Sequence, residues 1–134
     1  MLSLQDERQT MIREITDDGF GPVIFSYSRV QAIADGVLVD ISGLPIIRQH
    51  WRAPMCCTSA VWAGIQDAVS HGCDIDGVLH DLSWMAKCAI KLDPGQDHVL
   101  FDCTVGTNLR QYKLHCGPGD DGDLVLTLMF ANED

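Results

Sequence analysis

The chain has 134 residues, the length of one domain, and 46% of them are hydrophobic, enough to bury a core of ordinary size. A formal net charge of −10 argues against direct nucleic-acid binding, because few basic side chains remain to displace counterions from phosphates. The opening residues MLSLQDERQT lack the regions of a secretory signal, and no apolar run is long enough to span a bilayer. We therefore expect a cytoplasmic, acidic protein without membrane attachment, whose six cysteines are free thiols.

The first segment is expected to be a helical appendage. Residues 2–16 place Leu4, Met11 and Ile15 on one side of an amphipathic helix, and Asp17-Asp18-Gly19 ends it. Leading helices of this kind often fray. We therefore divide the chain into an N-terminal helical appendage, residues 1–20, and a single domain, residues 21–134.

The stretch from Gly21 to Ser42, GPVIFSYSRVQAIADGVLVDIS, contains the clearest local signals. The apolar run 22–27 predicts a short strand, and Ser28 is a hydroxyl N-cap for a helix over residues 29–35. Gly36 is placed to end that helix in the left-handed conformation. Residues 37–41 return to apolar, extended-type sequence.

This stretch resembles the signature of a domain-of-unknown-function family found in bacteria, their plasmids and phages, which reads GPVIxSYSRxQAIxDGVLVD. The resemblance continues at APMCCTSAVWAG, at LHDLSWMAKCAI and at the tail HCGPGDDGDLVLTLMFANED, so it covers most of the chain from Gly21 onward. Pro45, His80 and the Cys56-Cys57 pair depart from the family pattern. The resemblance implies a setting, in mobile genetic elements and bacterial cytoplasm, rather than a chemistry.

The middle of the chain predicts helices. Pro45 is suited to the first turn of a short helix, residues 55–57 read as a brief strand, and Thr58 or Ser59 caps the next helix, which Gly72 ends. The helix from about Asp76 to Lys91 has the broadest apolar face in the chain, with Leu82 at its centre and Lys87 on the opposite face.

The last third predicts strands. Three runs alternate apolar and polar residues, and glycine-rich turns separate them: 99–105, 112–116 and 124–130. Cys103 and Cys116 fall on the apolar face. Consecutive antiparallel strands form a meander, so we predict an α+β fold: a C-terminal three-stranded antiparallel meander with helices packed on one face.

No metal or cofactor is expected. Asp120, Asp121 and Asp123 crowd one glycine-rich turn, but their spacing differs from that of a calcium loop, and a solvated turn is the simpler interpretation. The cysteines and histidines lack the close pair spacing of a structural zinc site.

Catalysis is the alternative hypothesis. Cys57 stands just before a predicted helix N-terminus, where a thiolate is stabilised, although no histidine is singled out as its base. Tyr27, Arg29, His80 and Asp81 would be the residues of a cleft in a small enzyme or ligand-binding protein. Trp84, one helical turn after His80, would be a stacking wall beside them.

A non-catalytic binding protein is the function we expect. No nucleophile–base, metal or phosphate-loop motif is present, and Arg29, Trp51 and Trp62 each lie beside an apolar stripe, as interface anchors do. With the mobile-element resemblance, this predicts an inhibitor or regulator of a host complex, including a defence complex, that acts through protein–protein contact. A third hypothesis is an acidic nucleic-acid mimic, and homodimerisation stays open.

Overall fold

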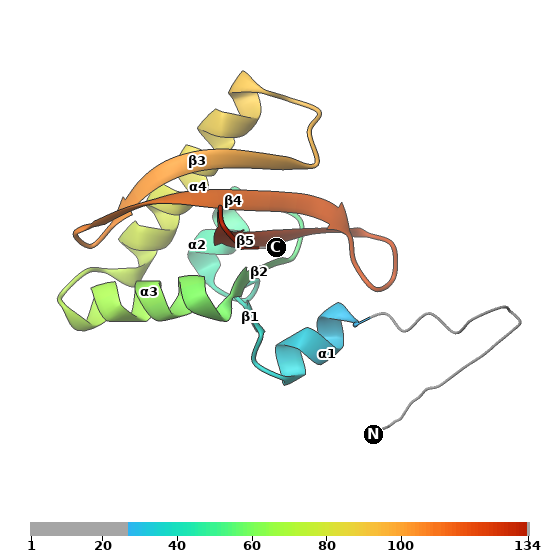
Figure 1. Cartoon of the computed structure of the whole chain (residues 1–134), viewed down its shortest axis with the longest axis horizontal. Helices are drawn as coiled ribbons and strands as arrows, with labels where there is room; N and C mark the ends of the chain where they lie inside the picture. Colours follow the sequence, from blue (N-terminus) through green and yellow to red (C-terminus); the bar gives the residue numbers. More distant parts are fainter. Residues whose placement is uncertain (1–26, 134) are drawn as a thin grey trace, which may run out of the picture.

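A computed structural model describes residues 27–133, and a five-stranded mixed sheet forms its centre (Figure 1). Neighbouring strands are antiparallel except for β2 and β5, which are parallel. The predicted appendage, residues 1–20, and most of the apolar run 22–27 lie outside the described residues. In spatial order the strands are β1 (Leu38–Asp40), β2 (Met55–Thr58), β5 (Leu124–Phe130), β4 (Asn108–Pro118) and β3 (His98–Val105).

In residues 27–133, four helices accompany the sheet: α1 (Arg29–Ala34), α2 (Pro45–His50), α3 (Ser59–Ser70) and α4 (Ile75–Leu92). α4 packs on β3, α3 packs on β5 and β2, and α2 packs against α4. Figure 1 shows α4 crossing behind β3 and β4, with α3 along the lower border of the sheet and α1 set apart beside β1. None of the helices within residues 27–133 combines the length and apolar content that a bilayer span requires.

Local sequence signals explain where the helices begin. Ser28 accepts a hydrogen bond from the amide of Gln31, and Thr58 accepts one from the amide of Val61, so each caps its helix. Asp74 caps α4 in the same way. Pro45 occupies the first turn of α2, where its missing N–H costs nothing. These helix starts agree with the predictions from sequence.

The α+β class is confirmed, but the predicted three-stranded sheet was too narrow. β3, β4 and β5 are antiparallel neighbours, and two further strands extend the sheet beyond β5. β2 pairs in parallel with β5, so that Met55 lies opposite Leu126 and Cys57 opposite Leu128. β1 then pairs with β2. Residues 37–41 and 55–57 were predicted to be extended, but pairing between segments so far apart in the chain leaves no local signal, so neither was assigned a partner strand.

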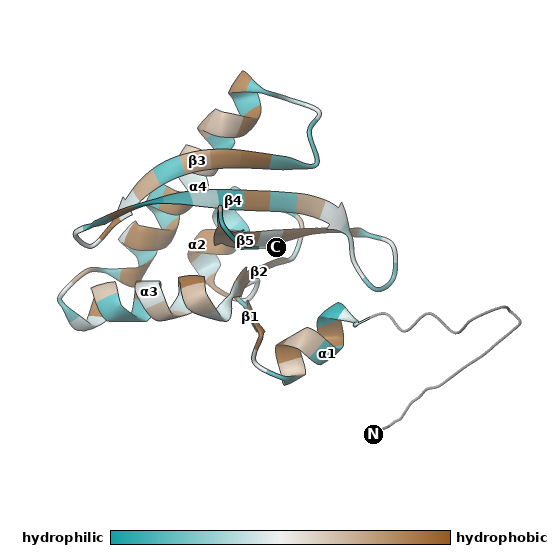
Figure 2. Ribbon diagram, in the orientation of Figure 1, coloured by the Kyte–Doolittle hydropathy of each residue, from teal (hydrophilic) through white to brown (hydrophobic). Residues whose placement is uncertain are grey.

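The core lies between the sheet and helices α2, α3 and α4. Along β3 buried and exposed residues alternate strictly, and Figure 2 shows brown and teal bands alternating along β4. Leu79 and Leu82 of α4 and Leu114 of β4 are almost completely buried. Cys103 is buried on this face and Cys116 is half-buried, as predicted. The helices therefore cover one face of the sheet.

α1 is attached by reciprocal polar contacts to the β4–β5 hairpin. The carboxylate of Asp120 accepts hydrogen bonds from the amides of Arg29 and Val30, at 2.9 and 3.0 Å. In return, the Arg29 guanidinium donates to the Thr127 hydroxyl at 2.7 Å and to the Leu126 carbonyl at 2.6 Å. The acidic turn thus holds the first turn of α1.

We expect Leu82→Ala to lower the free energy of unfolding by about 2–5 kcal/mol, because it leaves a cavity where α4 meets the sheet. Urea denaturation followed by circular dichroism measures this. The neighbouring exposed position provides a control: Asp81→Ala should change stability by less than about 0.5 kcal/mol. Equal effects would mean that α4 is rotated relative to the sheet.

Asp120→Ala should speed hydrogen exchange at the amides of Arg29 and Val30, since both lose their acceptor. Those two amides also hold the pKa of Asp120 below its usual range. In the wild type their protection should therefore be present above the ordinary carboxyl pKa and disappear as the pH falls through the lowered pKa. NMR exchange measurements test this, with Asp123→Ala as the control from the same turn. Unchanged exchange in Asp120→Ala would contradict the contact.

Candidate functional site

A cluster of nitrogen-bearing and aromatic side chains lies where the end of α2 meets α4. Ile47 is buried and orients α2, so that its last residues face the helix beside it. The Trp51 indole N–H, just beyond α2, donates to the Ser83 hydroxyl at 3.1 Å. That bond satisfies both a half-buried indole and a buried hydroxyl on α4. We call this region the α2–α4 surface.

Three side chains on this surface form a directed chain of hydrogen bonds. Nζ of Lys87 is 3.0 Å from Nδ1 of His50, and Nε2 of His50 is 2.9 Å from Nδ1 of His80. An ammonium group only donates, so Nδ1 of His50 accepts and its Nε2 carries the hydrogen. That hydrogen is donated to Nδ1 of His80, which leaves an N–H on Nε2 of His80. Since His80 is exposed, this last donor is available to a bound group.

Protonation of His50, the middle residue of this hydrogen-bond chain, is disfavoured. Burial, and then the charges of Lys87 and His80, lower the pKa of His50 below its ordinary value. The neutral form of His50 is also the form that the hydrogen-bond chain requires, because a protonated ring has no acceptor for Lys87. Geometry and electrostatics therefore select the same state.

Two tryptophans flank the chain. Nζ of Lys87 is 5.4 Å from the centroid of the Trp51 ring, within the range of a cation–π contact. The His80 ring stacks on Trp84 with 6.3 Å between centroids and 21° between planes. The side chain of Trp84 is 56% exposed, which is a large apolar area to leave in water.

The α2–α4 surface is also basic, although the whole chain is acidic. Arg48, Arg52 and Lys87 are three of the nine Lys and Arg residues. Arg48 and Arg52 border a surface hollow of about 410 Å³ that Trp51 also lines. Within residues 27–133, none of the three forms an ion pair with a carboxylate. Within that part of the chain, no carboxylate neutralises their charges.

The three predicted anchors lie on different elements. Trp51 belongs to the α2–α4 surface. Trp62 is half-buried on α3, packed against the core. Arg29 is on α1, and its guanidinium donates hydrogen bonds to the Thr127 hydroxyl and the Leu126 carbonyl. Trp51 is therefore the predicted anchor that lies on the α2–α4 surface.

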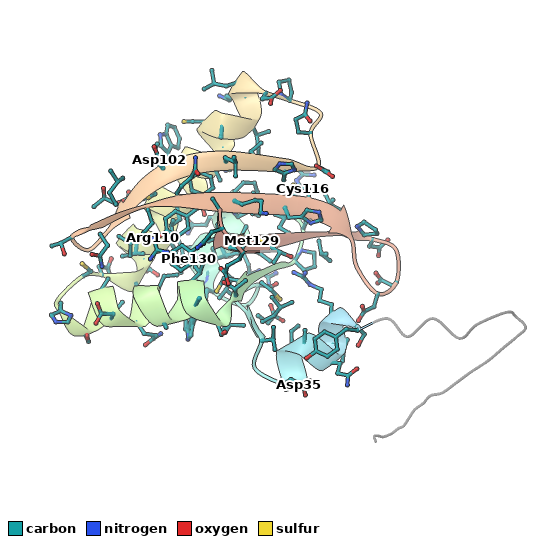
Figure 3. All side chains as sticks on the ribbon, viewed as in Figure 1. Asp35, Asp102, Arg110, Cys116, Met129 and Phe130 are labelled. Atoms are coloured by element: carbon teal, nitrogen blue, oxygen red, sulfur yellow. The ribbon has the colours of Figure 1, made fainter. Side chains whose placement is uncertain are left out.

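The four residues of the predicted cleft are not brought together. The Tyr27 hydroxyl donates to Asp35 at the far end of α1, labelled in Figure 3, and Arg29 reaches the face of the sheet opposite the core. A hollow of about 380 Å³ adjoins both residues, and its lining includes neither His80 nor Asp81. Those two are exposed on α4, which packs on the other face.

Nucleophilic catalysis by Cys57 has no support in the structure. The thiol is completely buried in β2, and burial followed by the neighbouring Cys56 raises its pKa to about 12. It is therefore a thiol rather than a thiolate near neutral pH. In the described part of the chain, no group of three or more His, Cys, Asp or Glu side chains is placed to hold a metal ion.

His50 and Lys87 were not predicted as site residues, and Trp84 was predicted only as a stacking wall beside His80. Lys87 was expected on a purely solvated face, whereas it is half-buried against α2. The spacing of His80, Trp84 and Lys87 (i, i+4 and i+7) places them on one helix face and was the available signal. Their partner His50 comes from α2, and only the packing of α2 on α4 reveals it.

Comparisons with protein-family models, with curated proteins and with solved structures found no match for the chain. The resemblance to the plasmid and phage family therefore stays a prediction, and the site is interpreted from its geometry alone.

We expect His50→Gln to flatten the loss of stability that the wild type shows on acidification. Since the folded-state pKa of His50 is lowered, the unfolded chain binds more protons, and stability falls as the pH drops from the ordinary histidine pKa towards that of the folded state. Thermal unfolding between about pH 7.5 and 5 measures the difference. His71→Gln, at the exposed end of α3, is the control. Parallel pH profiles for wild type and His50→Gln would contradict the hydrogen-bond chain.

Proposed function

We propose that this protein is a non-catalytic binding protein that acts through protein–protein contact, with the α2–α4 surface as its contact site. One observation carries the proposal. A chain of donors runs from Lys87 through His50 to His80 and ends beside the exposed ring of Trp84. Tryptophan next to cationic groups is the composition typical of interface hot spots.

The direction of the hydrogen bonds favours binding over acid–base catalysis. Nδ1 of His80 accepts from His50, and its Nε2 carries a hydrogen, so the exposed side of this ring donates rather than accepts. A general base needs a free acceptor nitrogen within reach of its substrate. Asp81, adjacent on α4, points in another direction from the helix axis and has no hydrogen bond with His80 in the described structure. The arrangement suits recognition of an acceptor group.

The chemistry of the surface specifies a partner segment that is acidic and partly apolar. Carboxylates would meet the N–H of His80 and the guanidinium groups of Arg48 and Arg52, while an apolar side chain would cover Trp84. Nucleic acid is a poorer fit, because the net charge of −10 repels a polyanion at longer range. The mobile-element resemblance makes a host complex, including a defence complex, the first partner class to test, with inhibition or regulation as the outcome.

The test is affinity capture from a bacterial host, followed by titration of the captured partner against purified variants. Trp84→Ala should weaken binding by about 2 kcal/mol or more, roughly 30-fold, while circular dichroism shows an intact fold. Trp51→Ala should weaken it as well. His71→Ala, at the exposed end of α3, is the control and should be silent.

Three outcomes would reject this site. Loss of binding confined to Trp62→Ala or Arg29→Ala would move the contact to α3 or α1. A small molecule in place of a stoichiometric protein would favour the ligand-binding alternative. An activity abolished by His80→Ala and Asp81→Ala, with the tryptophan variants active, would favour an enzyme.

A further inference from the structure

We infer that β3 is a docking strand for a second copy of this chain, and that the two β3 strands pair antiparallel across a two-fold axis. β3 is an edge strand of eight residues, and in residues 27–133 only β4 pairs with it. The opposite edge, β1, has three residues. Monomeric proteins commonly shorten, charge or cover such edges, because their free N–H and C=O groups pair readily with another strand.

The hydrogen-bond pattern shows which backbone groups are free. The amide of Cys116 on β4 donates to the carbonyl of Asp97, so the backbone of Asp97 faces β4. Along an antiparallel strand this orientation alternates, which makes every second residue face away from β4. The residues whose N–H and C=O face the open edge are His98, Leu100, Asp102 and Thr104.

Apolar side chains accompany this edge. Leu100 is 49% exposed on β3, and Leu92 at the end of α4 is 87% exposed. The two line a common hollow of about 340 Å³. Met85, 38% exposed, lies two helical turns before Leu92 on the same flank of α4. Two-fold pairing of β3 would bring this flank of α4 towards its copy.

The polar side chains of β3 favour one register for the two paired strands, and they indicate that the partner strand belongs to a second copy of this chain. With Leu100 opposite the second Leu100, each His98 lies opposite the other copy's Asp102, and this attractive pair occurs twice (Figure 3 labels Asp102 on β3). Centring on Asp102 would instead oppose two carboxylates. The His98 ring is 2.8 Å from Asp97 through Nδ1, which leaves Nε2 for the second copy. Because one strand supplies both the ring nitrogen of His98 and the carboxylate of Asp102, the edge is complementary to itself, as an isologous interface requires.

Sedimentation of the full chain over a wide concentration range tests this inference. The wild type should move from monomer to dimer, and Asp102→Lys should raise the dimer dissociation constant by about tenfold or more, because an ammonium group cannot accept the hydrogen bond from His98. His98→Asp should do the same, because it places two carboxylates opposite each other. The double variant carrying both substitutions should restore association, since a carboxylate then faces an ammonium group. Asp121→Lys, the same charge change in the exposed β4–β5 turn, should have no effect.

Hydrogen exchange provides a second readout. The amides of Leu100 and Asp102 should become protected as the concentration rises, while those of Val99 and Phe101, already paired with β4, should not change. A wild type that stays monomeric at every concentration overturns the inference. A dimer that is indifferent to Asp102→Lys, or that the double variant does not restore, overturns it too.

Discussion

The parallel pairing of β2 with β5 is the contact on which the rest of the structure depends. It joins the N-terminal half of the described chain to the hairpins of the C-terminal half, and Cys57 is completely buried opposite Leu128 at this junction. The Pro54 carbonyl accepts from the amide of Leu126 and extends the pairing by one residue. Because α2 directly precedes β2, this register also decides which part of α4 the end of α2 meets. The hydrogen-bond chain from Lys87 through His50 to His80 depends on that placement, as do the positions of Trp51 and Trp84 beside it.

The two candidate surfaces differ in what makes them available. On the α2–α4 surface, side chains already satisfy one another internally and present the last donor of the chain to solvent. On β3, one side of the backbone has no partner strand among residues 27–133. The first arrangement discriminates between partners by charge and shape, whereas the second accepts any extended strand and needs the side chains of His98 and Asp102 to become selective.

Much of the fold could be predicted from the sequence because its signals are local. Ser28, Thr58 and Asp74 cap helices within three residues of themselves, and the alternation along β3 identifies its buried face. Long-range contacts could not be predicted in this way. No residue near Arg29 in the sequence indicates that its guanidinium donates to the Thr127 hydroxyl. Likewise, no residue near His80 indicates that His50 is its hydrogen-bond partner. Of the candidate site, the sequence therefore predicted Trp51, His80 and Trp84, and Trp51 and His80 had been assigned to competing hypotheses.

α4 has two flanks with different chemistry. Lys87 and Leu92 are five residues apart, about 140° around the helix axis, and they face α2 and the β3 edge respectively. α4 therefore separates the α2–α4 surface from the β3 edge. If two copies join through β3, their α2–α4 surfaces diverge and remain open, and the assembly becomes bivalent. A partner with repeated acidic segments would then be held at high effective concentration, and two weak contacts would act as one strong one.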